Sequence, residues 1–489
     1  MTLSFKQFPL PRLPMTPYGV LHSEARRAFK AYDVRGIVDE ELTQSLAYAI
    51  GHAYAAEIKP SVVAVGRDIR LSGEDLTKSL IHGLNDAGVA VLDLGIVPTG
   101  AIYHATHALE VDGGIMVTAS HNPPEYNGFK FCRGTAAMAG KEIQDLADRI
   151  HHIPEPSSVK GLTTSVDIEP MLLEAIIRSA GRPQRTVHLA IDAGNAVPGP
   201  LLQRLMDELD VRHVDLYCSW DPTFPHHSPD PTRPQNMLDL GKTVVEAGAE
   251  VGIGVDGDGD RLGIVDEQGN FVTPDRLLAL FAQDVLEQAT EPELSIIYDV
   301  KCSMALEQTI RACGGTPIMM RTGHSFLKQA LRESPSSPLA GEMSGHFFFN
   351  DRWPGHDDAL YCAARLVEFL ARSPSPKDGG PTISSRLAEL PDYPSSNEVK
   401  IPLLGERADV MLAVTTALED AGGKLVTVDG VRIQWEYGWF LCRPSNTESI
   451  LVIRAEGMTQ EALETIVSEV SGRLKGIVDL GPLVEDILS

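Results

Sequence analysis

Ser120 and His121 stand next to each other in the segment VTASHNPPEYNGFK, which ends at Lys130. The apolar residues before Ser120 predict a strand, residues 122–124 predict a rigid turn, and Asn127–Gly128 predict a second turn leading back to Lys130. Such a loop presents a hydroxyl, an imidazole and an amine together, so Ser120 is a candidate nucleophile. A polar turn whose side chains only satisfy backbone groups is the alternative. A serine hydrolase is disfavoured because Ser120 lacks a G-x-S-x-G elbow.

Asp256, Asp258 and Asp260 alternate with glycine in DGDGDR, between the apolar stretches VGIGV and LGIV. Glycine lets the backbone bend tightly enough for three carboxylates to converge, which suits Mg²⁺. A solvated acidic turn or a calcium loop of the EF-hand type competes with this interpretation, and Glu267 even falls at the calcium loop's twelfth position. Arg261 takes the sixth position, where that loop needs glycine, and both flanks predict strands, so Mg²⁺ is favoured. Arg261 also indicates a bound phosphoryl group.

A third polar loop, GEMSGH, precedes the aromatic stretch FFF and contains Glu342, Ser344 and His346. A carboxylate such as that of Glu342 can accept hydrogen bonds from two adjacent sugar hydroxyls. A capped turn before a core strand explains the same residues equally well. In the nearby RWPGHDDA we expect His356 and Asp358 to be supporting or structural residues.

The fourth segment, CRPSNTES, combines Arg443 with Ser445, Asn446, Thr447 and several free backbone N–H groups. This combination predicts a phosphate-binding nest. A simple strand connection is the alternative, although it would need no arginine.

The composition limits the classes of partner. The chain has 489 residues, 42 Lys plus Arg against 67 Asp plus Glu, and a formal net charge of −25. This charge argues against a broad basic surface for nucleic acid or anionic lipid, but not against a small anionic substrate. No apolar run reaches membrane length. The six cysteines show no C-x-x-C spacing, which is typical of reduced cytosolic thiols.

Three segments repeat a strand, turn, helix and strand pattern, at residues 61–95, 187–217 and 294–325. We therefore expect an α/β fold with three related βαβ-type domains and mixed sheets. The last hundred residues predict a separate α+β domain, with a hairpin turning at Asp429–Gly430. Trp435, Tyr437 and Trp439 alternate and are expected to share one face of a strand, most simply for packing.

The expected domains follow from these patterns and from Pro-, Ser- and Gly-rich linkers. They are a loose leader (1–28), α/β domain 1 with Ser120 (29–165), α/β domain 2 with the metal loop (166–270), α/β domain 3 with the sugar loop (271–388) and an α+β domain with the phosphate loop (389–489).

Taken in order, the four motifs and FKAYDVRG at residues 29–36 resemble the α-D-phosphohexomutase superfamily, in its bacterial phosphomannomutase/phosphoglucomutase branch. The resemblance runs from residue 29 to the end of the chain. It implies four domains around a central cleft, the first three related and the last a flexible lid. It also implies one Mg²⁺ per chain and a hexose 1,6-bisphosphate that acts as intermediate and activator.

The resemblance also implies roles for individual residues. Ser120 would be the phosphoserine, holding Mg²⁺ together with Asp256, Asp258 and Asp260. Glu342 and Ser344 would bind the sugar hydroxyls at C3 and C4, while Arg443, Ser445, Asn446 and Thr447 would bind the existing phosphate. The other expected site residues, with Lys130 and His324 as the candidates for proton transfer, are Arg35, His121, Lys130, Arg261, Lys301, His324 and His346.

The implied reaction interconverts hexose 1-phosphate and hexose 6-phosphate, for mannose, glucose or both. Met343 within GEMSGH is typical of this branch, whereas phosphoglucosamine mutases usually carry Gln there. A phosphoglucosamine mutase is nevertheless the first alternative, and a metal-dependent sugar phosphatase or a non-catalytic sugar-phosphate-binding protein is the second. We expect a small phosphosugar as the partner, no nucleic acid or membrane, a monomer or weak homodimer, and a cytoplasmic location.

Overall fold

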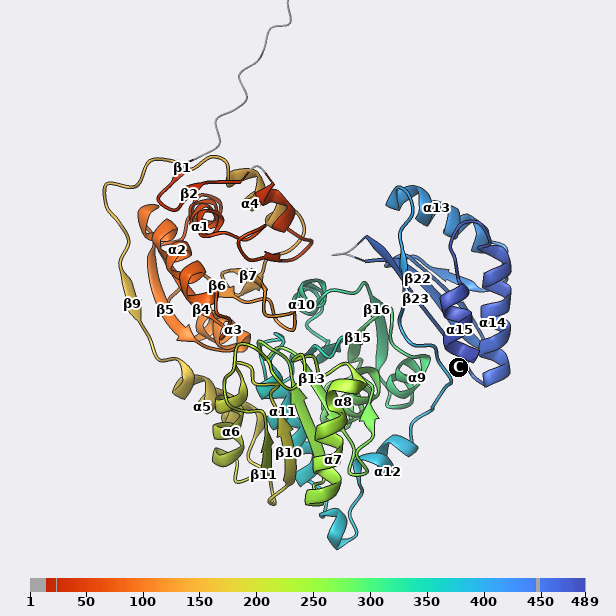
Figure 1. The fold of residues 1–489 in the computed structure, drawn as a ribbon. Helices are drawn as coiled ribbons and strands as arrows, with labels where there is room; N and C mark the ends of the chain where they lie inside the picture. The colour runs from red at the N-terminus through yellow and green to blue at the C-terminus, as the bar shows by residue number, and fades with distance from the viewer. Residues whose placement is uncertain (1–14, 23, 446–448, 489) are drawn as a thin grey trace, which may run out of the picture. The chain divides into compact units, whose positions relative to one another are not determined.

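The computed structural model describes residues 15–22, 24–445 and 449–488. The chain separates into two compact units. Unit 1 comprises residues 1–97, 102–119 and 123–167, and unit 2 comprises residues 98–101, 120–122 and 168–489. Figure 1 traces the elements in chain order by colour. Mixed sheets covered by helices confirm the predicted α/β class.

Unit 1 is built on one seven-stranded sheet, in the order β3-β7-β6-β4-β5-β9 with β8 beside β7. Strands β4 and β5 pair in parallel, and helix α2 connects them in the chain, which confirms the first predicted βαβ pattern. Apolar residues of α1, α2 and α4 form the main core with the sheet. The elements are β3 (Val34–Ile37), α1 (Gln44–Ile58), β4 (Val62–Arg67), α2 (Gly73–Asp86), β5 (Ala90–Ile96), α3 (Thr99–Ala108, whose first residues belong to unit 2), β6 (Gly113–Val117), β7 (Tyr126–Arg133), β8 (Ala136–Ala137), α4 (Lys141–Arg149) and β9 (Thr163–Ser165).

The described part of the expected leader is folded and not loose. Strands β1 (Met15–Thr16) and β2 (Gly19–Val20) pair as a hairpin, and a 3-10 turn, η1, follows at Ala25–Ala28. Leu21 is fully buried in the core of unit 1 together with Ala25 and Ala28. The leader was expected to be an open chain, but the apolar residues after Pro17 gain stability when they are buried against unit 1.

The strand that follows the Ser120 loop begins earlier than the sequence predicts. Asn127 and Gly128 lie inside β7, paired with Gly36 and Arg35 of β3, and do not form a turn. The turn is made by Pro123 and Tyr126, whose N–H donates to the Pro123 carbonyl at 3.0 Å. Glycine is required at residue 128 because a Cβ there would lie 2.3 Å from the Val34 carbonyl oxygen.

Unit 2 begins with two mixed sheets, in the orders β11-β10-β12-β13-β14 and β16-β15-β17-β18. Strands β10 and β11 pair in parallel, as do β15 and β16, which confirms the second and third predicted βαβ patterns. The elements are α5 (Glu169–Ala180), β10 (His188–Asp192), α6 (Gly199–Glu208), β11 (Arg212–Leu216), η2 (Pro234–Met237), α7 (Leu238–Ala247), β12 (Val251–Val255), β13 (Leu262–Val265), β14 (Phe271–Val272), α8 (Pro274–Gln288), β15 (Ser295–Asp299), α9 (Met304–Ala312), β16 (Thr316–Met320), α10 (His324–Glu333), β17 (Leu339–Gly341), β18 (Phe347–Phe349), α11 (Ala359–Ala371), η3 (Pro376–Asp378) and α12 (Ile383–Ala388).

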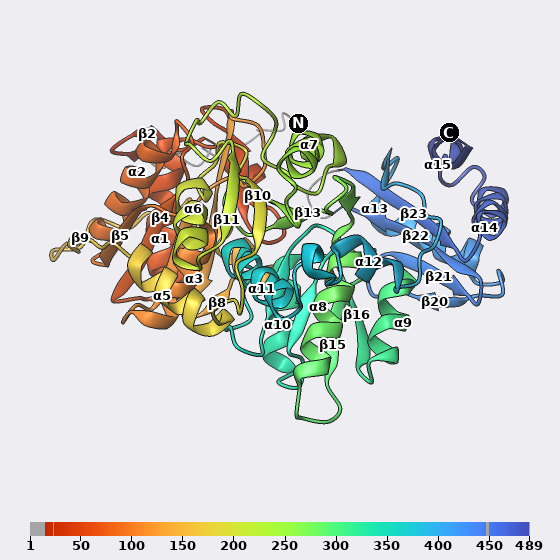
Figure 2. The same ribbon diagram turned by 90° about the horizontal axis from the view of Figure 1, so that it is seen from below.

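The last sheet of unit 2 is antiparallel, in the order β19-β23-β22-β21-β20. Helices α13, α14 and α15 share one apolar core with it. Figure 2 shows this sheet and its helices from below. The elements are β19 (Val399–Pro402), α13 (Arg407–Leu418), β20 (Lys424–Val426), β21 (Val431–Trp435), β22 (Gly438–Pro444), β23 (Ile450–Gly457), α14 (Gln460–Arg473) and α15 (Gly481–Leu488).

The aromatic residues of this sheet do not share one strand, which corrects the sequence prediction. A second turn separates β21 from β22, so Trp435 ends one strand, Tyr437 lies in the turn and Trp439 belongs to the next strand. The rings of Trp435 and Tyr437 stack, while Trp439 is fully buried. Their role is packing, as expected.

Within the described ranges, no helix combines the length and apolar character that crossing a membrane requires. All six cysteines carry free thiols, as their spacing predicts.

Candidate active site

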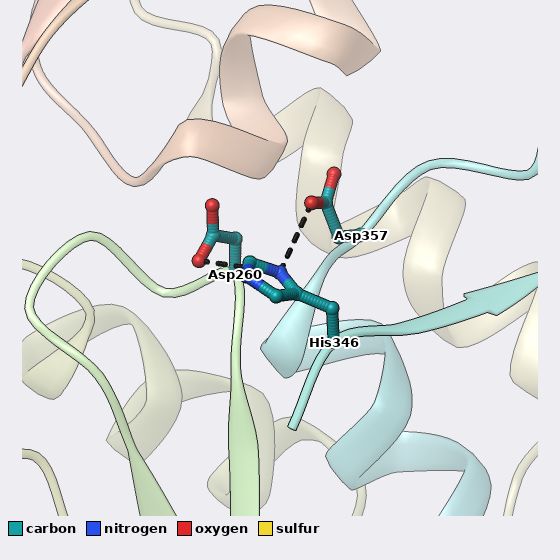
Figure 3. Close-up of side chains that lie close together, drawn as sticks. All are labelled: Asp260, His346 and Asp357. Carbon is teal, nitrogen blue, oxygen red and sulfur yellow. Dashed lines mark ion pairs between the residues drawn. The ribbon is translucent and has the colours of Figure 1, made fainter. Parts of the chain in front are cut away.

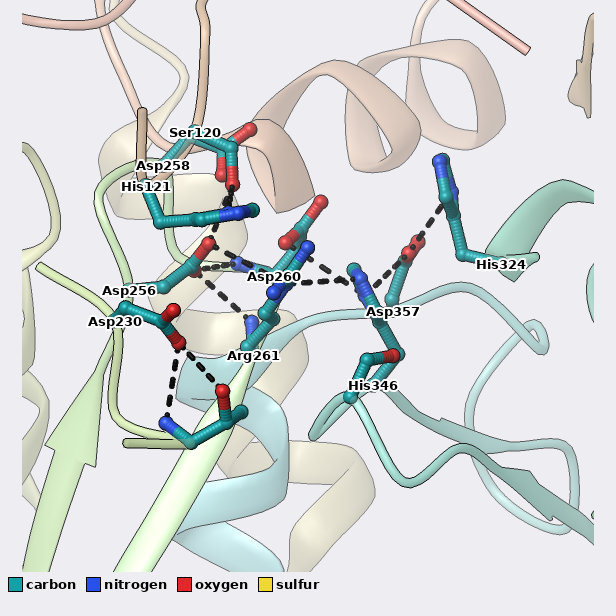
Figure 4. A network of polar contacts seen from close by, with 12 residues as sticks. Ser120, His121, Asp230, Asp256, Asp258, Asp260, Arg261, His324, His346 and Asp357 are labelled. Carbon is teal, nitrogen blue, oxygen red and sulfur yellow. Dashed lines mark hydrogen bonds and ion pairs between the residues drawn. The ribbon is translucent and has the colours of Figure 1, made fainter. Parts of the chain in front are cut away.

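Ser120 and Asp256 form the centre of a buried polar network (Figure 4). The Oγ of Ser120 donates a hydrogen bond to Oδ2 of Asp256 at 2.7 Å and lies 3.0 Å from Nδ1 of His121. The backbone of Ser120 has a φ of 51°, in the left-handed region. A non-glycine residue there costs roughly 1–3 kcal/mol, and such strain is concentrated at functional sites.

Asp256, Asp258 and Asp260 lie in the connection between β12 and β13, which form an antiparallel pair. Their carboxylate oxygens lie within 4.8 Å of one another and all three residues are buried. Three buried negative charges so close together repel one another unless they share a cation. Because oxygen donors are preferred by Mg²⁺ and Ca²⁺, this donor set fits a divalent cation.

Glycine allows the Ser120 loop to approach these carboxylates. A Cβ on Gly257 would lie 2.2 Å from the carbonyl oxygen of Ser120, so any other residue would push the two segments apart. Gly259 has a φ of 75°, which favours glycine for a second reason. Thr99 adds a further contact, since its Oγ1 donates to Oδ2 of Asp258 at 2.6 Å.

His346 connects the metal loop to the segment before α11 (Figure 3). Its Nδ1 lies 3.1 Å from Oδ2 of Asp357 and 3.6 Å from Oδ1 of Asp260. Its Nε2 accepts a hydrogen bond from Nε of Arg261 at 3.1 Å. Arg261 also lies 3.9 Å from Oδ2 of Asp256. The sugar loop and the metal loop are therefore parts of one network.

His324 begins α10 and is buried against Lys328, Asp357 and the stacked ring of His346. Burial and the neighbouring Lys328 charge lower the pKa of His324 to about 3, although Asp357 acts in the opposite direction. The imidazole is consequently uncharged at neutral pH.

Glu342 lies at the end of β17 and is 1 % exposed. Its Oε1 accepts the N–H of Gly323 at 2.5 Å, and its Oε2 accepts the hydroxyl of Ser344 at 3.2 Å. Burial raises the pKa of Glu342, although nearby His346 lowers it. A carboxylate held in this way is ready to accept further hydrogen bonds from a polyol.

Lys301 follows β15 and is buried beside two acids. Its Nζ lies 2.9 Å from Oε2 of Glu398. Burial alone would lower the pKa of Lys301, but the carboxylates of Glu398 and Asp299 more than offset this, so the pKa is raised. Lys301 therefore remains an ammonium group.

Arg443 lies near the end of β22, and Ser445 follows the strand directly. The Nε of Arg443 donates to Oδ2 of Asp429 at 2.7 Å, and the same oxygen accepts the N–H of Thr322 at 3.1 Å. The carbonyl of Ser445 accepts a hydrogen bond from Arg407. Asn446 and Thr447, which were expected to bind phosphate, lie outside the described residues.

Two expected site residues belong to unit 1. Arg35 in β3 pairs with Asp33, its Nη2 lying 2.6 Å from Oδ2. Lys130 is buried in β7, opposite Met116 of β6.

His356 and Asp358 were expected to be supporting residues. Asp358 caps α11, because its Oδ1 accepts the N–H groups of Leu360 and Tyr361 at 3.0 and 3.1 Å. Burial raises the pKa of Asp358 to about 7. Its carboxylate lies 2.5 Å from the position that a Cβ on Gly100 would take, so glycine is needed there. His356 is buried with its Nε2 4.0 Å from Asp358.

Sequence reasoning missed four network members: Thr99, Lys328, Asp357 and Asp429. Lys328 could have been found, since it lies four residues after His324 and so shares its helix face. Asp357 adjoins Asp358 in RWPGHDDA, where two acids before a helix were a visible signal. No sequence signal marked Thr99 or Asp429, because their partners are distant in sequence.

The chain matches the four family models of phosphoglucomutase/phosphomannomutase. Alpha/beta/alpha domain I matches residues 26–156, domain II matches residues 171–269, domain III matches residues 273–392, and the C-terminal domain matches residues 400–472.

Related proteins and a solved structure are similar to most of the chain. A phosphomannomutase/phosphoglucomutase of Pseudomonas aeruginosa is 42% identical over 456 residues, covering 92% of this chain and 96% of that protein. A phosphoglucomutase of Neisseria gonorrhoeae is 41% identical, covering 94% and 98%. The crystal structure of a phosphoglucomutase/phosphomannomutase family protein from Burkholderia thailandensis is 40% identical, covers 92% and 98%, and superposes with a TM-score of 0.86.

Proposed function

Because this chain belongs to the phosphoglucomutase/phosphomannomutase family and is a hexose-phosphate mutase, we propose that it works through a phosphoserine at Ser120. The proposed reaction interconverts the 1- and 6-phosphates of mannose and glucose through a hexose 1,6-bisphosphate. The observation that supports this most directly is the strained Ser120, whose Oγ lies 2.7 Å from the acidic triad.

Asp256, Asp258 and Asp260, with an oxygen of the Ser120 phosphate, would hold one Mg²⁺, which when bound supplies positive charge that offsets the charge of the phosphoryl oxygens. Arg261 adds a second positive charge beside the triad. The triad fits this role because its three carboxylates converge in a buried site.

The transfer itself is a substitution at phosphorus. A free hydroxyl of the hexose monophosphate attacks, its bond to phosphorus forms, and the bond between phosphorus and Oγ of Ser120 breaks. The proton of the attacking hydroxyl passes to a basic side chain, for which we propose Lys130, and is then returned to the departing Oγ of Ser120, so that no proton is gained or lost overall. The bisphosphate then turns round, and its other phosphoryl group returns to Ser120. Catalysis rests mainly on positioning and electrostatics.

Contacts that serve both orientations of the bisphosphate must be nearly symmetric. We propose that Glu342 and Ser344 bind the C3 and C4 hydroxyls, because these two oxygen groups are already joined at 3.2 Å. Mannose and glucose differ only at C2, so a site that reads C3 and C4 accepts both. We propose that the remaining expected site residues contact the distal phosphate or line the cleft. They are Arg443, Ser445, Asn446, Thr447, Lys301, Arg35, His121, His324 and His346.

The test combines an intact-mass measurement with a coupled assay. Purified protein should carry the mass increment of one phosphate, which Ser120→Ala removes together with turnover of mannose and glucose 1-phosphates. Near-normal turnover by Ser120→Ala would exclude the phosphoserine. A preference for glucosamine 1-phosphate would favour the phosphoglucosamine alternative, and stoichiometric release of inorganic phosphate would favour a phosphatase.

A further inference from the structure

A buried ion pair lies beneath the two histidines of the site. Lys328 and Asp357 are 3 % and 0 % exposed, and Nζ of Lys328 lies 2.7 Å from Oδ1 of Asp357. Each histidine approaches this pair with Nδ1. The pair contributes no group to the proposed phosphoryl transfer. Burying two charges costs free energy, so its presence here calls for another explanation.

The contacts of His346 determine which of its nitrogens carries the hydrogen. Nε of Arg261 can only donate, so Nε2 of His346, 3.1 Å away, must offer a lone pair. The hydrogen of the neutral ring then lies on Nδ1, which faces Oδ2 of Asp357 at 3.1 Å. Asp260 lies farther from the same nitrogen, at 3.6 Å. Of these two carboxylates Asp357 is therefore the nearer negative charge, and it favours this tautomer by electrostatic attraction and not by a hydrogen bond, since neither Nδ1 of His346 nor Oδ2 of Asp357 has a hydrogen-bond partner among the described residues.

The contacts of His324 lead to the opposite tautomer. Nζ of Lys328 lies 3.0 Å from Nδ1 of His324, and an ammonium group can only donate. Nδ1 of His324 must then accept, and its longer approach of 3.4 Å to Asp357 carries no hydrogen. A doubly protonated ring would place two positive donors face to face, which agrees with the lowered pKa of His324.

We infer that the Lys328–Asp357 pair sets opposite tautomers in the two histidines, Nδ1–H in His346 and Nε2–H in His324. Nε2 of His346 then accepts the hydrogen bond from Nε of Arg261, and this bond fixes the plane of the guanidinium group beside the metal loop. His324 presents a neutral N–H donor and not a base. Lys328 and Asp357 are thus positioning residues, and their effect on turnover rests on the proposed function.

The tautomers can be read without measuring activity. We propose long-range ¹H–¹⁵N spectra of the full chain, labelled at histidine and loaded with Mg²⁺, with resonances assigned from His324→Gln and His346→Gln. We expect a pyridine-type Nδ1 in His324 and a pyridine-type Nε2 in His346 at neutral pH. A pyridine-type Nδ1 in His346, or a pyridine-type Nε2 in His324, would overturn the inference whatever the reaction mechanism is.

Variants then test whether the pair is the cause. Lys328→Met should remove the Nε2–H preference of His324 and lower kcat by roughly 10- to 100-fold, with KM changed far less. Lys328→Arg, which keeps a cationic donor, should retain part of the Nε2–H preference of His324 and part of kcat. Lys242→Met, which breaks an exposed ion pair with Asp239, is the matched control and should change neither.

Unchanged tautomers in Lys328→Met would refute the inference. If Lys328→Met fails to fold, Asp357→Ala, which removes both the charge and the acceptor oxygens, provides the same test through His346. Loss of activity that follows loss of thermal stability, with both tautomers kept, would show a purely structural pair. Absence of a phosphoserine, by contrast, would contradict the proposed function and leave the tautomer assignment intact.

Discussion

The Oγ of Ser120 and the carboxylate of Asp256 share a 2.7 Å hydrogen bond although 136 residues separate them in the chain. The contact forms because Ser120 adopts a left-handed backbone and because Gly257 leaves room for its carbonyl. The proposed phosphoserine and the proposed cation site are joined in this way.

The strain at Ser120 can be separated from its chemistry. Ser120→Gly and Ser120→Ala both remove the hydroxyl and should both abolish mutase turnover. Glycine adopts a φ of 51° without strain, so Ser120→Gly should be more stable than Ser120→Ala by about 1 kcal/mol. Urea unfolding of the two variants measures the difference, and equal stabilities would contradict stored strain.

Metal removal should destabilise as well as inactivate. A chelator leaves three buried carboxylates repelling one another, so we expect a lower Tm that added Mg²⁺ restores by mass action. Asp258→Asn should weaken Mg²⁺ binding roughly tenfold or more while raising the stability of the metal-free protein. Calorimetric titration and thermal unfolding measure both effects. The exposed Asp207→Asn is the control, and an identical response from it would argue against the site.

Asp358 should make stability depend on pH. Burial raises its pKa from the ordinary 3.8 to about 7, so the folded protein holds a proton that the unfolded chain releases. Its contribution to stability is complete below pH 3.8 and is lost as the pH rises through 7, by roughly 4 kcal/mol at most. Asp358→Asn keeps an acceptor for the α11 cap, so it should flatten this dependence. Unfolding of both proteins from pH 5 to 8 tests the sign, and parallel curves would exclude Asp358.

Glu342→Gln should separate substrate binding from folding. Its amide oxygen can still accept the N–H of Gly323, and it removes a buried charge whose pKa burial has raised. Stability at neutral pH should therefore be kept or increased. Hydrogen bonds to a charged group contribute roughly 1.5–3 kcal/mol each. Loss of such a bond to the sugar should therefore lower kcat/KM by about 10- to 100-fold. Unchanged kinetics would remove Glu342 from the sugar site.

Arg443→Lys should weaken phosphate binding more than catalysis. The guanidinium is oriented by Asp429 at 2.7 Å, and lysine cannot keep that contact while offering a fork of donors to a phosphate. We expect KM for the hexose phosphate to rise about tenfold, with a smaller change in kcat. Steady-state kinetics give the two values separately. A fall in kcat at constant KM would instead place Arg443 at the transferred group.

The elements of the fold were predictable where their signals are local. The three parallel βαβ patterns were visible as short stretches of residues. The errors arose where neighbours override local preference. Asn127–Gly128 favours a turn in isolation, but pairing with β3 holds it in a strand. Leu21 lies in the expected loose leader, yet the core of unit 1 buries it.

By itself, the sequence determined the chemistry of this protein, because a serine beside histidine, an acidic loop with glycines and an arginine-containing nest are each encoded within a few residues. Tertiary structure alone decided which of these groups meet. Asp357 contacts both histidines, and Asp429 orients Arg443, across separations for which no short pattern exists. Hydrogen bonds and charge compensation between distant segments depend on how the chain packs, and packing is a property of the whole fold.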